Sequence, residues 1–379
     1  MRYFLIAGEA SGDIHGAGLI KEIKKKDPEA TFMFFGGDLM EQQGGTLKKH
    51  YRDMAFMGIL PVLMNLRAIR KNFSLCKKEL LLFNPDVLIL IDYPGFNLRM
   101  AKFAKANGIS TAYYISPKIW AWKTKRVWKI KKYIDRMYTI FPFETGFYQK
   151  YNYPVTYAGN PVYDYIREEL KTKEDFHQFC YSNNLPDKPI VAILAGSRQH
   201  EIGSLLPVME EVSRFFPDYQ FIVAGAPTFN DDFYRSVMKT DMPVLHDQTF
   251  SLLKNSSAAL VASGTATLET ALLNIPQVVC YKMGMGWFLE LFRKQILKTD
   301  FFSLVNLIAE KEVVKELFQS QVTAETIRDE LKKLLSDELY RSVMLEEYSG
   351  IALKLKSDGA AAVAARCICE SVKKSKSEK

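Results

Sequence analysis

A polar turn between an apolar strand and a helix is the first place where residue types and spacing indicate chemistry. Residues 258–262 form an apolar run typical of a buried parallel strand, and residues 267–273 combine helix-forming residues with apolar spacing. Ser263, Gly264 and Thr265 lie between them. Such a turn leaves backbone N–H groups at the positive end of the helix dipole, where a phosphate is favoured. The segment therefore predicts a phosphate site.

Glu269 lies about one turn into the same helix, on a face from which its carboxylate reaches a ribose hydroxyl. An ordinary strand-to-helix turn followed by a solvated glutamate is the alternative. This segment alone leaves both interpretations open.

A second small-residue turn follows the apolar run 2–7 at the start of the chain. It spans residues 8–18, and its Asp13 is placed to cap a helix that continues to about Lys26. The glycine spacing is not G-x-G-x-x-G, and no acidic residue ends a second strand. A dehydrogenase is therefore disfavoured.

The elements that carry these turns alternate between strand and helix. Helices are expected at 61–83, 97–107 and 205–216, the last after a loop at 195–201, and the tail 323–379 is helical by pattern. Strands are expected at 2–7, 31–35, 86–91, 110–115, 137–141, 190–194, 220–224, 244–246 and 258–262. This alternation predicts an α/β fold of two Rossmann-like, doubly wound domains facing a cleft, with ligands at the carboxyl ends of the strands.

Domain boundaries follow from the restart of the pattern after a polar linker. We expect a first domain at 1–165, a second at 166–345, and C-terminal helices at 346–379 that pack back on the first domain. Charge divides in the same way: residues 1–165 carry 25 Lys and Arg against 14 Asp and Glu, and the remainder carries 26 against 29. The first half is therefore expected to bind an anionic partner, such as nucleic acid, a membrane surface or a phosphorylated substrate.

Composition excludes several classes of protein. Five scattered cysteines without a C-x-x-C predict reduced thiols in a cytoplasm, and exclude a disulfide scaffold or a zinc site. The longest apolar stretch, 54–64, is far below the ~20 residues of a membrane-spanning helix, and residues 3–7 are too short for a signal peptide.

Residues 116–132 hold three of the four tryptophans and seven basic residues. No nucleic-acid-binding module surrounds them, so we expect no nucleic-acid partner and interpret them as a basic, partly buried helix.

Seven segments form a set that is specific in its order and spacing. They are Gly-Glu-Ala-Ser-Gly-Asp at 8–13, Asp-Tyr-Pro-Gly-Phe-Asn at 92–97, Ser-Pro-Lys-Ile-Trp-Ala-Trp at 116–122, Phe-Pro-Phe-Glu at 141–144, Gly-Ser-Arg at 196–198, Ala-Ser-Gly-Thr at 262–265 with Glu269, and Lys-Thr-Asp-Phe-Phe-Ser-Leu-Val-Asn-Leu at 298–307. Over residues 1–350 the set resembles the lipid-A-disaccharide synthase family, inverting glycosyltransferases of the two-Rossmann GT-B type. The Tyr-Pro-Gly and Lys-Ile-Trp positions depart somewhat from the family pattern.

The resemblance implies a reaction and a location. UDP-2,3-diacylglucosamine would be joined to 2,3-diacylglucosamine 1-phosphate (lipid X), giving the β-1′,6-linked disaccharide 1-phosphate of lipid A and UDP. The protein would be cytoplasmic and peripheral on the inner face of a Gram-negative inner membrane.

The departing UDP explains what the donor site must do. Negative charge builds on its β-phosphate, and enzymes stabilise that charge with a metal or with helix dipoles and cations. The sequence contains no Asp-x-Asp, so we expect neither metal nor cofactor. Arg198, in a loop just after a strand, is the predicted cation, with a surface salt bridge as its alternative role. The donor-binding residues expected are Ser197, Arg198, Gln199, Ser263, Gly264, Thr265, Glu269 and Asn306.

An inverting transfer also needs a base for the 6-hydroxyl of the acceptor. Asp92 directly follows the strand 86–91, and Pro94 and Gly95 break the chain behind it. We therefore predict that Asp92 is the base and Arg198 the second catalytic residue. The alternatives are that Asp92 caps the next helix and that His15 is the base. The acceptor-binding residues expected are Ser11, Gly12, Asp13 and His15.

Residues 54–66 are strongly apolar and are followed at once by basic residues. Gly58 and Pro61 interrupt regular structure, so the segment fits an element lying in the lipid interface, with a buried core segment as the alternative. The membrane contacts expected are Met57, Ile59, Leu60, Val62, Leu63 and Leu66.

Two other functions stay open at this point. One is a UDP-N-acetylglucosamine 2-epimerase or another GT-B glycosyltransferase, such as a lipid II-type N-acetylglucosaminyl transferase, which the motifs at 92–96 and 120–122 disfavour. The other is a non-catalytic lipid-binding protein of the membrane surface. Acyl-chain length and oligomeric state, a homodimer included, are left open.

Overall fold

The computed structural model describes residues 1–54, 66–121, 124–172, 174–282 and 301–377. The chain forms two compact units. The first contains Met1–Pro161 and Ser357–Lys379, and the second contains Val162–Lys356. The chain thus leaves the first unit at residue 161 and returns to it for its last segment.

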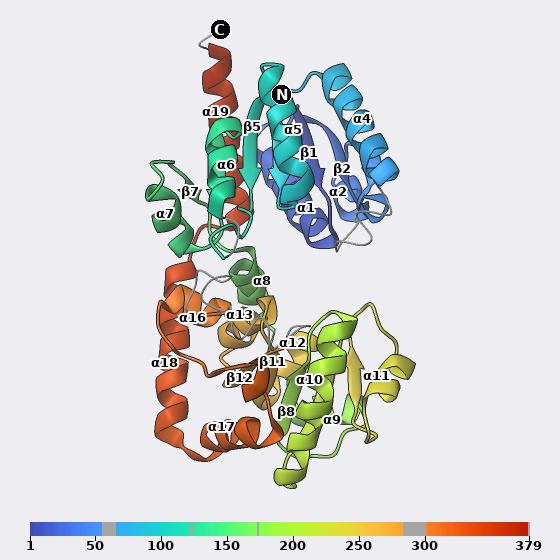
Figure 1. Ribbon diagram of the computed structural model, residues 1–379, viewed down its shortest axis with the longest axis vertical. Helices are drawn as coiled ribbons and strands as arrows, with labels where there is room; N and C mark the ends of the chain where they lie inside the picture. Colours follow the sequence, from blue (N-terminus) through green and yellow to red (C-terminus); the bar gives the residue numbers. More distant parts are fainter. Residues whose placement is uncertain (55–65, 122–123, 173, 283–300, 378–379) are drawn as a thin grey trace. The chain divides into compact units, whose positions relative to one another are not determined.

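Among the described residues, the first unit contains a seven-stranded parallel sheet in the order β3-β2-β1-β4-β5-β6-β7 (Figure 1). Its strands are β1 (Arg2–Ala7), β2 (Thr31–Gly36), β3 (Thr46–His50), β4 (Val87–Ile91), β5 (Ser110–Tyr114), β6 (Arg136–Thr139) and β7 (Thr156–Tyr157). Its helices are α1 (Ala10–Lys26), α2 (Asp38–Gln42), η1 (Tyr51–Asp53), α4 (Leu66–Phe83), α5 (Pro94–Ala106), η2 (Thr124–Arg126), α6 (Val127–Tyr133), α7 (Pro142–Gln149) and α19 (Ala360–Ser377).

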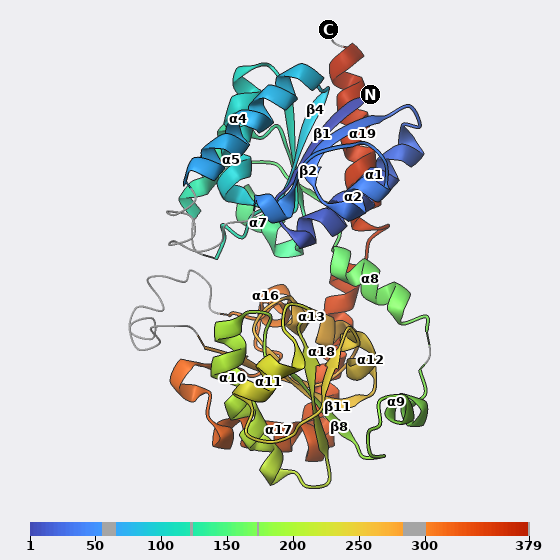
Figure 2. The ribbon, with the colours of Figure 1, turned by 90° about the vertical axis from the view of Figure 1, so that its right-hand side faces the viewer.

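Side chains alternate between the two faces of this sheet, as a strand period of two requires. Tyr3 and Leu5 of β1 pack into one apolar cluster with α1 and α19, while Phe4 and Ile6 pack into the other with α4, α5 and α6. Figure 2 shows α1 and α19 side by side on their face of the sheet. The first unit is therefore a three-layer sandwich that needs its C-terminal helix to cover one layer.

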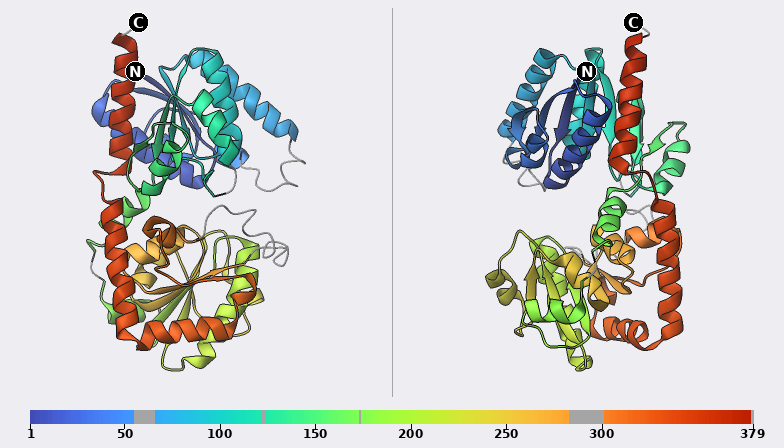
Figure 3. Two further views of the ribbon diagram at one scale, coloured as in Figure 1. Left: turned by 60° about the vertical axis from the view of Figure 1, so that its left-hand side comes forward. Right: turned by 180° about the vertical axis from the view of Figure 1, so that it is seen from behind.

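The second unit has its own parallel sheet, six-stranded in the described part of the chain, in the order β10-β9-β8-β11-β12-β13. Its strands are β8 (Ile190–Leu194), β9 (Gln220–Gly225), β10 (Val244–His246), β11 (Ser256–Ala262), β12 (Gln277–Tyr281) and β13 (Glu316–Phe318). Its helices are α8 (Pro161–Glu169), α9 (Phe176–Ser182), α10 (Gln199–Val212), η3 (Ser213–Phe215), α11 (Asp231–Val237), α12 (Thr249–Lys254), α13 (Thr265–Leu272), α16 (Leu304–Ala309), η4 (Gln319–Gln321), α17 (Ala324–Ser336) and α18 (Glu338–Leu355). Helix α17 packs on β11 and β12, and α18 packs on α13 and α16 (Figure 3).

The predicted fold class of two doubly wound parallel-sheet units is confirmed, whereas several local boundaries differ. Helix α5 begins at Pro94 and not at residue 97, because proline is well tolerated in a first helical turn. Helix α10 begins at Gln199 and not at residue 205, which shortens the predicted loop. The sequence pattern also misses β3, an edge strand whose lysines break the apolar alternation that marks strands.

None of the described helices is long and apolar enough to cross a membrane. All five cysteines are free, so no disulfide closes either unit. Of the predicted helix 61–83, residues 66–83 are described and form α4, whereas residues 61–65 lie outside the described part of the chain.

Candidate functional site

Each sheet has one point where the strand order reverses, and this point is where ligands bind in open α/β sheets. In the first unit it lies between β1 and β4, because the chain moves to β2 on one side and to β5 on the other. In the second unit it lies between β8 and β11. The predicted site residues can therefore be tested against two specific edges.

The edge of the first unit brings the turn after β1 against the turn after β4. Ala7 pairs with Ile91, so Gly8 lies beside Asp92 in the parallel register. A Cβ atom on Gly8 would lie 2.2 Å from the ring of Tyr93, which leaves room for glycine alone. The strand pairing thus places the base predicted from sequence beside the glycine-rich turn.

The backbone of this second turn is unusual. Asp92 and Tyr93 both have left-handed conformations, with φ of 42° and 46°. For a residue other than glycine this costs on the order of 1–3 kcal/mol each, and such residues cluster at functional sites. The N-cap of α5 is Tyr93, and no side chain caps the helix there. Asp92 therefore does not serve as the helix cap that was the alternative to a catalytic role.

The electrostatics of Asp92 suit a proton acceptor. Burial raises the pKa of its carboxyl, while the charge of Lys118 and a hydrogen bond from the backbone N–H of Tyr93 partly oppose this rise. A general base works best when its pKa approaches the operating pH. Lys118 lies in the loop after β5, the strand next to β4, and its side chain is exposed.

A buried glutamate that the sequence reasoning missed anchors the loop carrying Lys118. The indole Nε1 of Trp120 donates to Glu144 Oε1 at 3.3 Å, and the N–H groups of Ile140 and Phe141 donate to Oε2 at 3.1 and 3.0 Å. Burial raises the pKa of Glu144 to about 7, against the opposing effect of these hydrogen bonds. Its place in the motif 141–144 was visible in the sequence, but its bond to Trp120, 24 residues away, was not.

The predicted acceptor-binding residues lie in the first two turns of α1, directly after β1. Ser11 is exposed and Gly12 is buried. Asp13 does not cap α1, whose N-cap is Glu9; instead its carboxylate accepts N–H bonds from the start of α2. The donors are the backbone groups of Gly37, Leu39 and Met40, at 2.8, 3.1 and 3.1 Å. The predicted capping role of Asp13 in α1 is therefore wrong, because the helix starts one turn earlier.

His15 is half-buried in the same helix. Burial lowers the pKa of its imidazole to about 4, so the ring is neutral at physiological pH. A neutral imidazole of such low basicity donates or accepts a hydrogen bond more readily than it takes up a proton. Its acceptor-binding role stays a prediction.

The edge of the second unit brings the loop after β8 beside the turn after β11. Gly196 has φ of 109°, and a Cβ atom there would lie 2.7 Å from Glu201 Oε2. The same oxygen accepts the N–H of Ser197 at 3.2 Å, while Oε1 pairs with Arg198 at 3.4 Å. The Arg198 side chain is 62% exposed. Glu201, which the sequence reasoning missed, therefore shapes the loop and leaves the guanidinium at the surface.

The turn 263–265 starts helix α13, as the sequence predicts in outline. Gly264 is the N-cap, Thr265 is the first helical residue, and no side chain caps this end. Gly264 and Thr265 are exposed, and the Ser263 hydroxyl donates to Phe302 O at 3.3 Å. The N-terminal N–H groups of α13 are thus not capped by a side chain. Burial raises the pKa of Glu269, which lies within α13.

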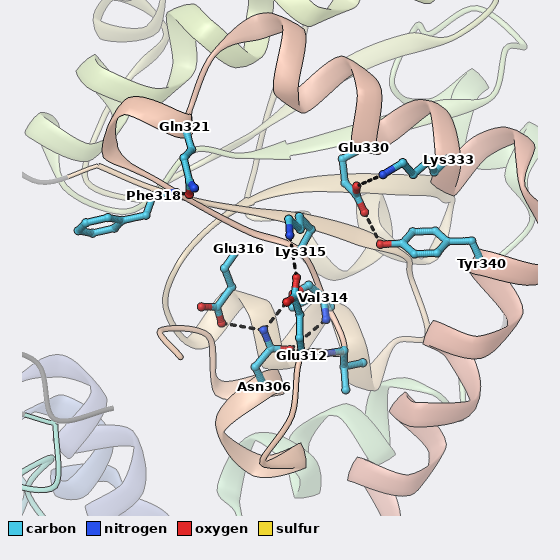
Figure 4. A network of polar contacts seen from close by, with 11 residues as sticks. Asn306, Glu312, Val314, Lys315, Glu316, Phe318, Gln321, Glu330, Lys333 and Tyr340 are labelled. Atoms are coloured by element: carbon cyan, nitrogen blue, oxygen red, sulfur yellow. Dashed lines mark hydrogen bonds and ion pairs between the residues drawn. The ribbon is translucent and has the colours of Figure 1, made fainter. Parts of the chain in front are cut away.

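The predicted donor residue Asn306 lies in α16, is fully buried, and hydrogen-bonds the segment that follows this helix (Figure 4). Its Nδ2 donates to Val314 O and Glu316 Oε1, both at 2.9 Å, and its Oδ1 accepts the N–H groups of Val313 and Val314. Glu316 in turn accepts the N–H of Phe302. These contacts assign Asn306 a structural task, so its donor-binding role rests on the resemblance alone.

No group of three or more histidine, cysteine or acidic side chains with metal-binding geometry occurs in the described residues.

The predicted membrane contacts Met57, Ile59, Leu60, Val62 and Leu63 lie outside the described residues, as does the side chain of Leu66. Met54, at the start of that apolar stretch, is buried in the core of the first unit.

With this geometry in hand, comparison with known proteins decides the family. The sequence model described as lipid-A-disaccharide synthetase matches residues 3–366. The chain belongs to the lipid-A-disaccharide synthetase family. Lipid-A-disaccharide synthase of Trichlorobacter lovleyi is 37% identical over 366 residues, covering 95% of this chain and 94% of that protein. The enzyme of the same name from Coxiella burnetii is 37% identical and covers 96% of each.

Solved structures that resemble this member of the synthetase family share its fold at low sequence identity. UDP-GlcNAc 2-epimerase from Neisseria meningitidis, bound to UDP-GlcNAc, has a TM-score of 0.67 at 15% identity and covers 99% of this chain and 100% of that one. A glycosyltransferase from Rickettsia africae has a TM-score of 0.60 at 12% identity and covers 98% of each chain. These likenesses confirm the two-sheet GT-B architecture and do not distinguish epimerase from transferase.

Proposed function

We propose that this protein catalyses the reaction for which its family is named, the synthesis of the lipid A disaccharide. The donor is UDP-2,3-diacylglucosamine, the acceptor is lipid X, and the products are the β-1′,6-linked disaccharide 1-phosphate and UDP. The observation that carries the proposal is the match to the synthetase family over residues 3–366. The UDP-GlcNAc 2-epimerase described above shares the fold of this chain, at 15% sequence identity.

The proposed mechanism divides the work between the two units. The carboxylate of Asp92 removes the proton from the 6-hydroxyl of lipid X while the hydroxyl oxygen attacks C1 of the donor sugar. The bond between C1 and the β-phosphate oxygen breaks, and UDP carries away the electron pair. Arg198 and the N-terminal N–H groups of α13 stabilise the charge that develops on the β-phosphate. Their exposure and their common edge in the second sheet support this assignment.

The decisive test is incubation of the purified protein with both lipid substrates, followed by mass spectrometry of the lipid product and of UDP. We expect disaccharide 1-phosphate and UDP in equal amounts, and an unchanged rate in EDTA because the proposed charge stabilisation uses no metal. With UDP-N-acetylglucosamine alone we expect neither an epimer nor free sugar. Epimer formation would identify the epimerase alternative, and absence of UDP release would favour a lipid-binding protein. Inhibition by EDTA that Mg²⁺ reverses would reject the metal-free mechanism alone.

We further propose that the segment containing Met57, Ile59, Leu60, Val62, Leu63 and Leu66 touches the membrane surface on the cytoplasmic side. The first half of the chain is basic, and α4 begins with basic residues directly after the apolar stretch. Each such residue near an anionic surface contributes about 1 kcal/mol, which salt screens, while apolar insertion persists at high salt.

Replacement of Leu60 and Leu63 by serine should therefore reduce binding to anionic liposomes and the need for detergent, with little change in melting temperature. The matched control is serine at Leu81 and Leu82, which are 48% and 69% exposed on α4 and should leave liposome binding unchanged. High salt should weaken the wild-type association only in part. A large fall in melting temperature for the Leu60 and Leu63 variant would show that the segment belongs to the core.

A further inference from the structure

Two buried side chains from neighbouring elements converge on the main chain of Asp92. Asn97, in the first turn of α5, donates from Nδ2 to the carbonyl of Asp92 at 2.7 Å and to that of Ile91 at 3.1 Å. The hydroxyl of Tyr113, in the adjacent strand β5, donates to the same Asp92 carbonyl. Both side chains are completely buried. The carbonyl of Asp92 is thus held by two donors from the interior.

Other contacts hold the same turn. The N–H of Asp92 donates to the carbonyl of Tyr114 at 3.3 Å, and the hydroxyl of Tyr93 donates to the carbonyl of Met54 at 2.9 Å. A left-handed backbone at two successive non-glycine residues persists only where its surroundings determine it. Loss of one donor would let this turn relax toward a more common conformation.

We propose that Asn97 and Tyr113 are positioning residues, which set the direction of the Asp92 carboxylate by holding its carbonyl. The inference rests on the proposed role of Asp92 as the base. Because both side chains are completely buried, they act through the backbone of Asp92 and not by touching substrate. A shift of about 1 Å in a catalytic group can cost roughly 100-fold in rate, so a single hydroxyl is enough to matter.

A purely structural role is the competing explanation, since any buried hydroxyl that bonds a carbonyl stabilises a fold. The first unit supplies a matched control for that explanation. Tyr153 lies in the same apolar cluster as Tyr113, and its hydroxyl donates to the carbonyl of Ile134 at 2.9 Å. The two tyrosines therefore make the same kind of bond in the same core, but only one of them holds Asp92.

The experiment compares Tyr113→Phe with Tyr153→Phe in the full-length protein, with melting temperature, kcat and KM as readouts. Each variant loses one hydroxyl and keeps its ring, so both should fold with a similar small loss of melting temperature. Tyr113→Phe should lower kcat by roughly 10- to 100-fold with KM for both substrates nearly unchanged. Tyr153→Phe should keep the wild-type kcat.

A double variant decides whether Tyr113 acts through Asp92. In the Asp92→Asn background, Tyr113→Phe should cause no further loss of the residual rate, because the group that it positions is already absent. Equal loss in both backgrounds, or a Tyr113→Phe variant with wild-type kcat, would overturn the inference while leaving Asp92 as the base. A wild-type rate for Asp92→Asn alone would instead reject the base, and this inference with it. If Tyr113→Phe fails to fold, Asn97→Ser, which removes the other donor, carries the same comparison.

Discussion

Replacement of Asp92 by asparagine should abolish most turnover while leaving the fold and UDP binding intact. The amide has the size of the carboxylate but cannot accept the proton of the attacking hydroxyl. Loss of a general base typically costs about 10²–10⁴-fold in rate. The carbonyl of Asp92, which accepts from Asn97 and Tyr113, is unchanged by the substitution, so the turn should persist. The measurement is kcat, together with melting temperature and UDP affinity.

The pH dependence gives a second measurement on the same residue. The base must be ionised, so the rate should fall as the pH drops through the pKa of Asp92, which burial raises above its ordinary value. The acidic limb of the wild-type profile should therefore lie above pH 3.8, the ordinary value for this carboxyl. His15→Ala is the comparison variant and should retain kcat far better than Asp92→Asn. A near wild-type rate in Asp92→Asn with a large loss in His15→Ala would transfer the base role to His15.

Replacement of Arg198 by alanine should weaken donor binding and slow the chemical step. Its guanidinium is proposed to meet charge that is greatest on the departing β-phosphate, so the loss should appear in kcat as well as in KM. Removal of one such donor to a developing anion costs about 10²–10³-fold in kcat in well-studied enzymes. Steady-state kinetics with UDP release as the readout will measure both constants.

The second unit offers a closely matched control arginine. Arg214 is also 62% exposed and also pairs with a glutamate three positions away, Glu211, at 3.8 Å. It lies in η3 after α10, not at the turn after β8. Arg214→Ala should therefore leave both kinetic constants unchanged. Equal effects of the two substitutions would mean that Arg198 contributes only general surface charge, and the cation for the leaving group would have to be sought elsewhere.

The sequence predicts the two sheets well because buried parallel strands appear as short apolar runs. The predicted ranges 2–7, 190–194 and 244–246 coincide with β1, β8 and β10. The position of Asp92 at the end of a strand is predicted for the same reason, since it directly follows the run that forms β4. Edge strands that carry lysines, such as β3, lack this apolar run.

What the sequence does not predict are partners that meet only through the sheet order. Tyr113 holds Asp92 because β5 lies beside β4, and Asp13 reaches the start of α2 from another helix. Asn306 is a second case: its motif indicates ligand binding, and the sequence gives no sign that its amide bonds the backbone of Val314, beyond the end of α16. A pattern identifies the face or turn that a residue occupies, whereas its hydrogen-bond partners depend on register and neighbouring elements.

The return of the chain to its first unit has a consequence for biosynthesis. Helix α19 completes the apolar cluster of β1 and α1, and the hydroxyl of Tyr3 lies 3.4 Å from the sulfur of Cys369. On the ribosome, residues 162–356 are made between these two parts, which takes roughly 10–40 s at about 5–20 residues per second. During that interval the nascent first unit exposes the apolar face of α1 that α19 will cover. Synthesis of α19, and not of the first 161 residues, therefore sets when this unit can close its core.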